Sequence, residues 1–71
     1  MTDTQPSFGR MWQYKFLASP HREEIEVREF NGDDTAEAYA RELSKSREIP
    51  IIIERHGIVD WAYIDEVDER T

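Results

Sequence analysis

The sequence predicts an α+β domain in which one helix covers one face of a four-stranded, mainly antiparallel sheet, with the elements in the order β-β-α-β-β. Three patterns support this fold class. Apolar and polar residues alternate over 12–17 and 25–30, as they do in half-buried strands. Apolar residues recur at helical spacing over about 35–46, and an Ile-rich segment with aromatic residues follows over 49–67. A sheet with one covering helix is the simplest arrangement that buries all three patterns.

The first two strands are expected to form an antiparallel hairpin. The aromatic side chains of 12–17 share one side of the strand and are expected to face the core: Trp12, Tyr14 and Phe16. In 25–30 the alternation predicts that Ile25 and Val27 point inward and that Glu26 and Arg28 point outward. The connecting loop contains Ser19-Pro20 and several charged residues, so it is longer than a minimal turn.

The helix is expected to begin after the break at Asn31-Gly32. Asp33 or Asp34 is expected to cap the first turn by accepting hydrogen bonds from its free N–H groups. Small and large apolar residues form the stripe that should face the sheet: Ala36, Tyr39, Ala40 and Leu43. The helix must end before Pro50, because the residue that precedes a proline disfavours helical geometry.

The segment 49–67 predicts a second hairpin with a two-residue turn at His56-Gly57. Such a turn pairs Glu54 with Val59 and Ile52 with Trp61. The face with the small side chain of Ala62 is expected to receive the helix, and it holds Ile51, Ile53, Ala62 and Ile64. The open face is expected to hold Ile52, Glu54, Val59, Trp61 and Tyr63.

Composition narrows the classes of function. The 71 residues include 16 acidic and 9 basic ones, for a net charge of −7, which argues against direct nucleic-acid binding because that depends on a basic surface. The absence of cysteine excludes disulfides and zinc–thiolate sites. No signal peptide is visible, and the longest apolar run, 49–53, is too short to span a membrane. We therefore expect a cytoplasmic protein that does not bind membranes.

The chain is expected to divide into a flexible N-terminal arm at 1–10, a single α+β domain at 11–67 and an acidic C-terminal tail at 68–71. A domain of this size buries only about 60% of the surface that its unfolded chain exposes, so association often adds stability. Phe8 is the one large apolar side chain of the arm that could dock onto the domain.

The sequence contains no catalytic, metal or phosphate motif, so no catalytic residue, metal ligand or cofactor is assigned. His21 and His56 lie far apart, without the spacing of metal ligands. An enzyme whose site forms at a dimer interface stays an alternative. A deep pocket lined by His56, Asp60 or Tyr63 would favour that alternative, whereas a flat apolar face would favour binding.

The leading hypothesis is a small, acidic, non-enzymatic protein-binding domain that forms a homodimer through the open sheet face or the strand edges next to it. The interface candidates are Ile52, Val59, Trp61 and Tyr63. A monomer would result instead if Phe8 covered this face, or if a shifted register placed Trp61 in the core. A heterologous partner is a further alternative.

A second class of hypothesis is an acidic inhibitor or DNA mimic that contacts a basic nucleic-acid-processing protein. Its support is the concentration of carboxylates near the end of the chain. The candidates for such a contact are Asp65, Glu66, Asp68 and Glu69.

Overall fold

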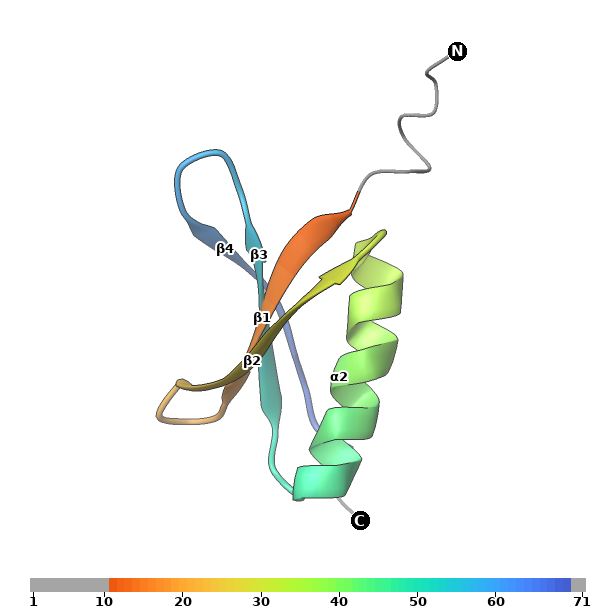
Figure 1. The fold of residues 1–71 in the computed structure, drawn as a ribbon. Helices are drawn as coiled ribbons and strands as arrows, with labels where there is room; N and C mark the ends of the chain where they lie inside the picture. Colours follow the sequence, from red (N-terminus) through yellow and green to blue (C-terminus); the bar gives the residue numbers. More distant parts are fainter. Residues whose placement is uncertain (1–10, 70–71) are drawn as a thin grey trace.

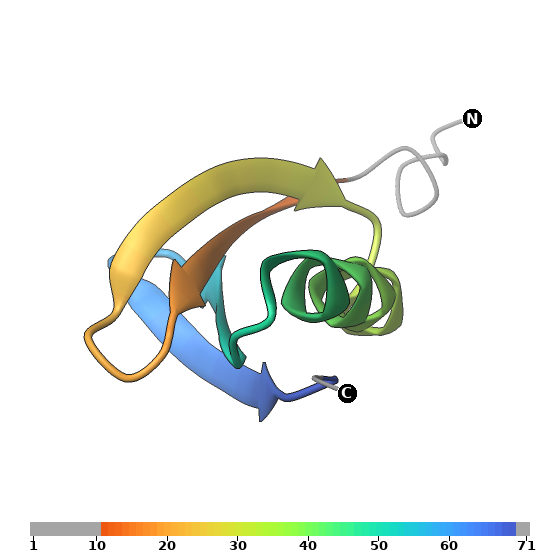
Figure 2. The same ribbon diagram turned by 90° about the horizontal axis from the view of Figure 1, so that it is seen from below.

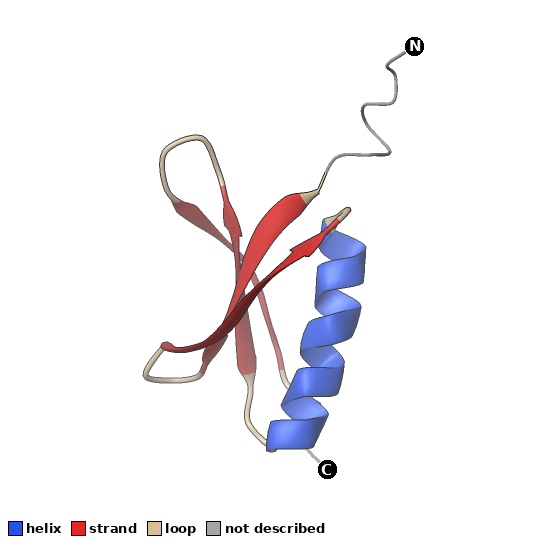
Figure 3. Ribbon diagram, viewed as in Figure 1, coloured by secondary structure: helices blue, strands red, loops and turns tan. Residues whose placement is uncertain are grey.

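The computed structural model describes residues 11–69, in which a single helix lies across one face of a four-stranded sheet (Figures 1 and 3). The elements are β1 (Trp12–Ala18), β2 (Glu23–Phe30), α2 (Asp33–Arg47), β3 (Ile51–His56) and β4 (Trp61–Val67). Their order and the α+β fold class confirm the sequence prediction. The predicted arm at 1–10, with Phe8, and the last two residues of the predicted tail lie outside the described residues.

The strands are arranged in the order β2-β1-β3-β4, and each neighbouring pair is antiparallel. Because β1 runs antiparallel to both of its neighbours, β2 and β3 run parallel to each other with β1 between them. The helix α2 connects these two strands, and the sheet curves around it (Figure 2). The centre of the sheet therefore combines one strand from each hairpin.

The core forms where β1 and β3 face the helix. Tyr14 and Phe16 of β1 and Ile51 and Ile53 of β3 are completely buried. From the helix, Ala36 and Ala40 are also completely buried, and such small side chains allow a helix to lie close to a sheet. Tyr39 and Leu43 of the same stripe are partly buried against this core, as are Phe30, Ile25 and Ile64. Trp12, which was expected to face the core, is 39% exposed at its margin.

The side-chain orientation predicted for β2 is right for Ile25, which packs against the core, but wrong for Glu26, Val27 and Arg28. Glu26 lies opposite Phe16, and Arg28 lies opposite Tyr14, so both charged residues are on the helix side of the sheet. Val27 lies opposite Lys15 on the open face, where it is 41% exposed.

The hydroxyl of Tyr39 explains why charged residues are accommodated on the helix side. This hydroxyl donates a hydrogen bond to Glu26 Oε1 at 2.5 Å and accepts one from Arg28 Nη1 at 3.0 Å. An irregularity in the β1–β2 register leaves Ile25 without a cross-strand partner, yet Ile25 packs against the core. This bulge reverses the alternation that begins at Ile25.

The start of α2 also differs from the prediction. Gly32 is the N-cap residue, and no side chain caps the first turn. Asp33 instead accepts hydrogen bonds from Tyr14 and Arg55, which lie on β1 and β3. The C-terminal end follows ordinary chemistry, because Glu48 adopts a left-handed conformation and its N–H donates to the Ser44 carbonyl.

The register predicted for the second hairpin is wrong as well. Glu54 lies opposite Tyr63 and His56 lies opposite Trp61, so the connection is a four-residue loop at 57–60 rather than a two-residue turn. Cross-strand partners share a face and residues two positions apart in a strand share a face. Trp61 and Tyr63 therefore still lie on the open face with Ile52 and Glu54, as predicted.

The β3–β4 pairing contains a second bulge, because Ile53 pairs with Asp65 whereas the next residue, Glu54, pairs with Tyr63. The bulge changes which residues of β4 face the helix after Tyr63. Ile64 packs against the core, and Asp65 lies opposite Ile53 on the helix side. Ala62 shares that side through its pairing with Arg55, but Ala62 is exposed, and so it does not provide the helix contact that the sequence suggested.

Candidate interaction surface

The loop at 57–60 carries the most exposed apolar side chains of the described residues. Ile58 is 100% exposed and Val59 is 90% exposed. The Gly57 N–H donates to the Asp60 carbonyl at 2.8 Å, and the Asp60 carboxylate accepts from the Trp61 N–H at 2.8 Å. A Cβ at position 57 would lie 3.1 Å from the Asp60 carbonyl oxygen, so glycine suits this tight closure. The backbone bonds hold the loop while its two aliphatic side chains face solvent.

Trp61 lies at the base of this loop and is partly covered by two neighbouring side chains. The His56 ring meets it edge-on, with 4.9 Å between ring centroids. The Lys15 ammonium lies 4.4 Å from the centroid of the Trp61 ring, which is a cation–π contact. Trp61 is therefore partly exposed and does not lie in the core, so the alternative that a shifted register places it there is wrong.

Tyr63 follows on the same face of β4 and is 61% exposed. Together with the loop it forms what we call the hairpin surface, defined as Ile58, Val59, Trp61 and Tyr63. Three of these four residues were interface candidates from sequence, and Ile58 was missed. The two-residue turn assumed for this hairpin made Ile58 a paired strand residue, whereas the longer loop exposes it.

The fourth sequence candidate, Ile52, does not belong to this exposed surface. Ile52 is 4% exposed and lies opposite Leu17, which is 6% exposed, although both are on the face without a helix. An ion pair between Arg22 and Glu54 forms on this face. Within residues 11–69, no helix covers this face of the sheet. The aliphatic stems of long polar side chains such as Arg22 and Glu54 can cover apolar neighbours in its place.

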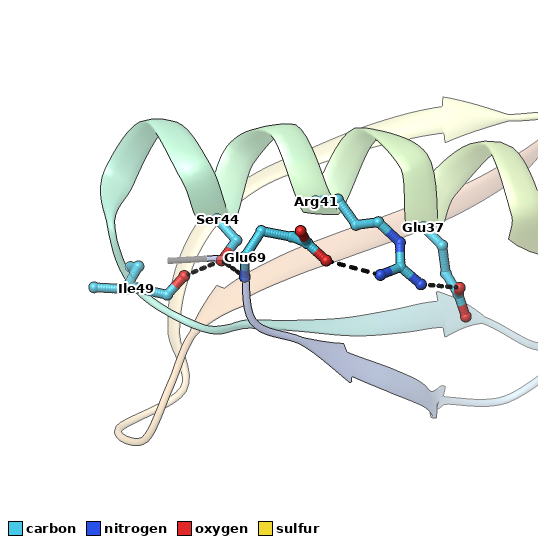
Figure 4. Close-up of polar contacts among 5 residues, drawn as sticks. All are labelled: Glu37, Arg41, Ser44, Ile49 and Glu69. Carbon is cyan, nitrogen blue, oxygen red and sulfur yellow. Dashed lines mark hydrogen bonds and ion pairs between the residues drawn. The ribbon is translucent and has the colours of Figure 1, made fainter. Parts of the chain in front are cut away.

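The four acidic residues suggested for contact with a basic partner do not lie on one surface. Glu69 accepts a hydrogen bond from Arg41 at 3.0 Å, and its backbone N–H donates to Ser44 Oγ at 2.9 Å (Figure 4). Glu66 and Asp68 are exposed, and Glu66 lies opposite Ile52 on the open face. The structure therefore does not gather these four carboxylates into one array, since Glu69 and Asp65 both lie against α2.

Asp65 forms part of a carboxylate pair with Glu37 of the helix. The pKa of Glu37 is raised by a side-chain hydrogen bond with Asp65, by burial and by the Asp65 charge, while Arg41 acts in the opposite direction. Arg41 reaches Glu37 at 3.4 Å as well as Glu69 at 3.0 Å (Figure 4). One guanidinium thus contacts two carboxylates, while Asp65 raises the pKa of Glu37.

A separate depression of about 550 Å³ lies at the N-terminal end of α2. Its lining residues are Trp12, Tyr14, Asn31, Gly32, Asp33, Asp34, Thr35 and Arg55. None of His56, Asp60 and Tyr63 belongs to this lining, so it is not the pocket that would have favoured an enzyme at the hairpin.

Within this depression, Asp33 Oδ1 accepts from the Tyr14 hydroxyl at 2.6 Å and from Arg55 Nη1 at 2.8 Å. Burial, together with the hydrogen bond and charge of Asp33, raises the pKa of Tyr14 to about 12. Tyr14 is therefore a neutral hydrogen-bond donor at physiological pH, which suits a structural role. The sequence signal for this contact was the presence of two consecutive acids at a helix start where one would suffice as a cap.

Within residues 11–69, no group of three or more acidic or histidine side chains is arranged to hold a metal ion. Among the same residues, no helix combines the length and apolar character needed to cross a membrane.

Comparison of the chain with protein-family models, with curated proteins and with solved structures finds no match. A functional proposal for this chain therefore rests on the chemistry and exposure of its own surfaces.

Proposed function

We propose that this chain is a protein-binding domain that self-associates through the hairpin surface. The observation that carries the proposal is the exposure of Ile58 and Val59, at 100% and 90%, next to Tyr63 at 61%. Single exposed apolar residues are common, but a group of them on one protruding loop and strand is typical of a contact surface. Aromatic residues such as Trp61 and Tyr63 are enriched at the centres of such contacts.

A second copy is the partner that this surface favours. Closed two-fold dimers are the commonest symmetric assemblies, and they need one self-complementary patch. The hairpin surface supplies apolar residues to both sides of such a contact. Two of the carboxylates suggested for a basic partner, Asp65 and Glu69, are instead engaged with the chain's own helix, which gives less support to the acidic inhibitor.

The test is the mass of the protein in solution across a dilution series, measured by light scattering. We expect the wild type to approach twice its 8.4 kDa chain mass on concentration. The double substitution Ile58→Ser with Val59→Ser should weaken this association by at least about tenfold, because burial of one such side chain contributes roughly 1.5–3 kcal/mol.

The matched control is Val27→Ser, which removes an exposed aliphatic residue from the opposite edge strand. This variant should associate like the wild type. A wild type that keeps the mass of one chain at every concentration would refute self-association, and equal association of all three proteins would refute the role of the hairpin surface.

A further inference from the structure

The short connection between β2 and α2 is formed by Asn31 and Gly32, which lie outside both the strand and the helix (Figure 3). We propose that this Asn-Gly pair is a site of spontaneous covalent modification, at which the Asn31 side chain loses its amide nitrogen and becomes a carboxylate. The reaction needs only solvent water, and each product carries one more negative charge than the unmodified chain. This inference is independent of the proposed self-association.

The reaction begins at the main-chain nitrogen of Gly32. This nitrogen gives its proton to solvent and attacks Cγ of the Asn31 amide, so that the new N–Cγ bond closes a succinimide ring. The Cγ–Nδ2 bond breaks, and the amide nitrogen leaves as ammonia with a proton taken from solvent. Water then opens the ring at either of its carbonyl groups, which gives aspartate or isoaspartate at position 31. No atom is oxidised or reduced, and the attack is fast for a side chain held next to its nucleophile.

Gly32 favours this attack because it has no side chain. A Cβ on the residue after an asparagine restricts the approach of its nitrogen to the asparagine side chain, and glycine removes that restriction. The surroundings add none, since a Cβ built at Gly32 would meet no atom within 4 Å. Gly32 is extended, with φ −178° and ψ 169°, a conformation that any residue can adopt. The fold therefore leaves this position open without itself requiring a glycine.

The Gly32 N–H is available for the reaction. Its carbonyl accepts a hydrogen bond from the Ala36 N–H at 3.1 Å, but within residues 11–69 its own N–H donates to no other group. Most main-chain N–H groups of strands and helices are held in hydrogen bonds, which oppose the loss of their protons. Asn31 is exposed, so solvent reaches the site. The nucleophile and the solvent that accepts its proton can therefore meet.

Thr35 contacts the group that is attacked. Its hydroxyl donates a hydrogen bond to Asn31 Oδ1 at 3.0 Å. This oxygen becomes negatively charged when the Gly32 nitrogen adds to Cγ, and a donor that is already in place stabilises such a charge. Thr35 is thus a positioning residue, which orients the amide and favours the intermediate of the attack.

The products change the rim of the depression at the start of α2. Asn31 and Gly32 belong to its lining, together with Asp33, Asp34 and Arg55. Aspartate at position 31 adds a third carboxylate to this lining, where the unmodified chain has a neutral amide. Isoaspartate also adds a carbon atom to the main chain directly before the N-cap residue. The modification therefore alters both the charge of the depression and the connection that positions the helix.

The test is the mass of the full-length chain during incubation in mildly alkaline buffer. Asn31 is the only asparagine of the sequence, so peptide mapping assigns the exchange of an amide for a carboxyl to it and separates aspartate from isoaspartate. Because the site is exposed and its N–H is free, the folded chain should react no more than about threefold slower than the same chain in urea. Greater protection than this would overturn the proposal, since the fold would then shield the site.

Two sets of variants test the named groups. Gly32→Ala should slow the reaction by at least about tenfold, and the open space at this position allows the fold to be retained. Thr35→Val should slow it by about threefold or more, whereas Thr35→Ser keeps the hydroxyl and should react like the wild type. Circular dichroism verifies the fold of each variant.

The outcomes separate the site from its supporting contact. Equal rates in the wild type and Gly32→Ala overturn the attack by the Gly32 nitrogen. Equal rates in Thr35→Val and Thr35→Ser overturn the role of the Thr35 hydroxyl. Asn31→Asp provides the reference for the aspartate product, and a treated wild type that never yields this product or its isomer overturns the proposal.

Discussion

Removal of the Asp33 carboxylate should destabilise the fold far more than removal of the adjacent Asp34. Asp33 accepts hydrogen bonds from Tyr14 and Arg55 at 2.6 Å and 2.8 Å, and it is the only partner that these two groups share among the described side-chain contacts. Tyr14 is completely buried. In Asp33→Ala the Tyr14 ring would stay buried while its hydroxyl, at the depression beside α2, would lose this acceptor.

The expected cost follows from these contacts. A buried donor left without its acceptor costs about 1–3 kcal/mol. The ion pair with the partly exposed Arg55 adds at most about 1 kcal/mol. Asp33→Ala should therefore lower the free energy of unfolding by about 1–4 kcal/mol. Asp34→Ala removes a carboxylate from the same first turn, where its interaction with the helix dipole is worth about 0.3–1 kcal/mol.

The assay is urea denaturation followed by circular dichroism, at a dilution where the protein has the mass of one chain. Tyr14→Phe alone should cost about 1–2 kcal/mol, and with Asp33→Ala the two costs should add to less than their sum, because both variants remove the same hydrogen bond. Equal stability of the Asp33→Ala and Asp34→Ala variants, or strict additivity in the double variant, would refute this reasoning.

The ionisation of Tyr14 provides an independent reading of the same contact. Its pKa is raised to about 12 by burial and by Asp33, above its ordinary value of 10.0. The folded chain therefore holds this proton more tightly than the unfolded chain, so the stabilisation is complete below pH 10 and is lost as the pH rises toward 12. Tyr14→Phe should lack this alkaline loss, which denaturation at both ends of the range would measure.

Two further predictions concern the contacts between α2 and the end of the chain. The pKa of Glu37 is raised above its ordinary 4.5 by its hydrogen bond with Asp65, so this proton stabilises the fold at acidic pH and its contribution is lost as the pH rises through the raised value. The stability of the wild type relative to Glu37→Gln should therefore fall as the pH rises above 4.5, and parallel stability curves would contradict the pairing. Ser44 is completely buried and bonds both the Ile49 carbonyl at 2.6 Å and the Glu69 N–H at 2.9 Å. Ser44→Ala should cost about 1–3 kcal/mol in urea denaturation, whereas the exposed Ser46→Ala should cost almost nothing; the idea fails if their midpoints coincide.

The sequence predicted correctly those parts of the fold in which the periodic pattern of apolar residues is not interrupted by a bulge. The alternation around Tyr14 and Phe16 and the helical spacing of Ala36 and Ala40 identified buried positions correctly. The orientation of β2 was not predictable in this way, because a bulge at Ile25 adds a residue and reverses the alternation after it. The Tyr39 hydroxyl, which accommodates charged neighbours on the helix side, is a tertiary contact that no local pattern reveals.

The hairpin surface was only partly predictable for a related reason. His56-Gly57 resembles a two-residue turn, but the Gly57–Asp60 hydrogen bond closes a four-residue loop. The register moved by four positions, from Val59 to Tyr63 opposite Glu54. Because this number is even, Trp61 and Tyr63 kept their predicted face. The burial of Ile52 opposite Leu17 on the face without a helix could not be anticipated from strand periodicity, which assigns a face to a residue but not its exposure.

The position of β1 between β2 and β3 affects the order in which this chain can fold during its synthesis. The first hairpin is complete before β3 exists, but the residues that cover Tyr14 and Phe16 include Ile51 and Ile53 from the later hairpin. An isolated pair of strands is at best marginally stable in water. A nascent chain that ends within α2 therefore exposes its aromatic residues. The core that covers these residues is complete only when β3 and β4 are both present, because it includes Ile53 and Val67.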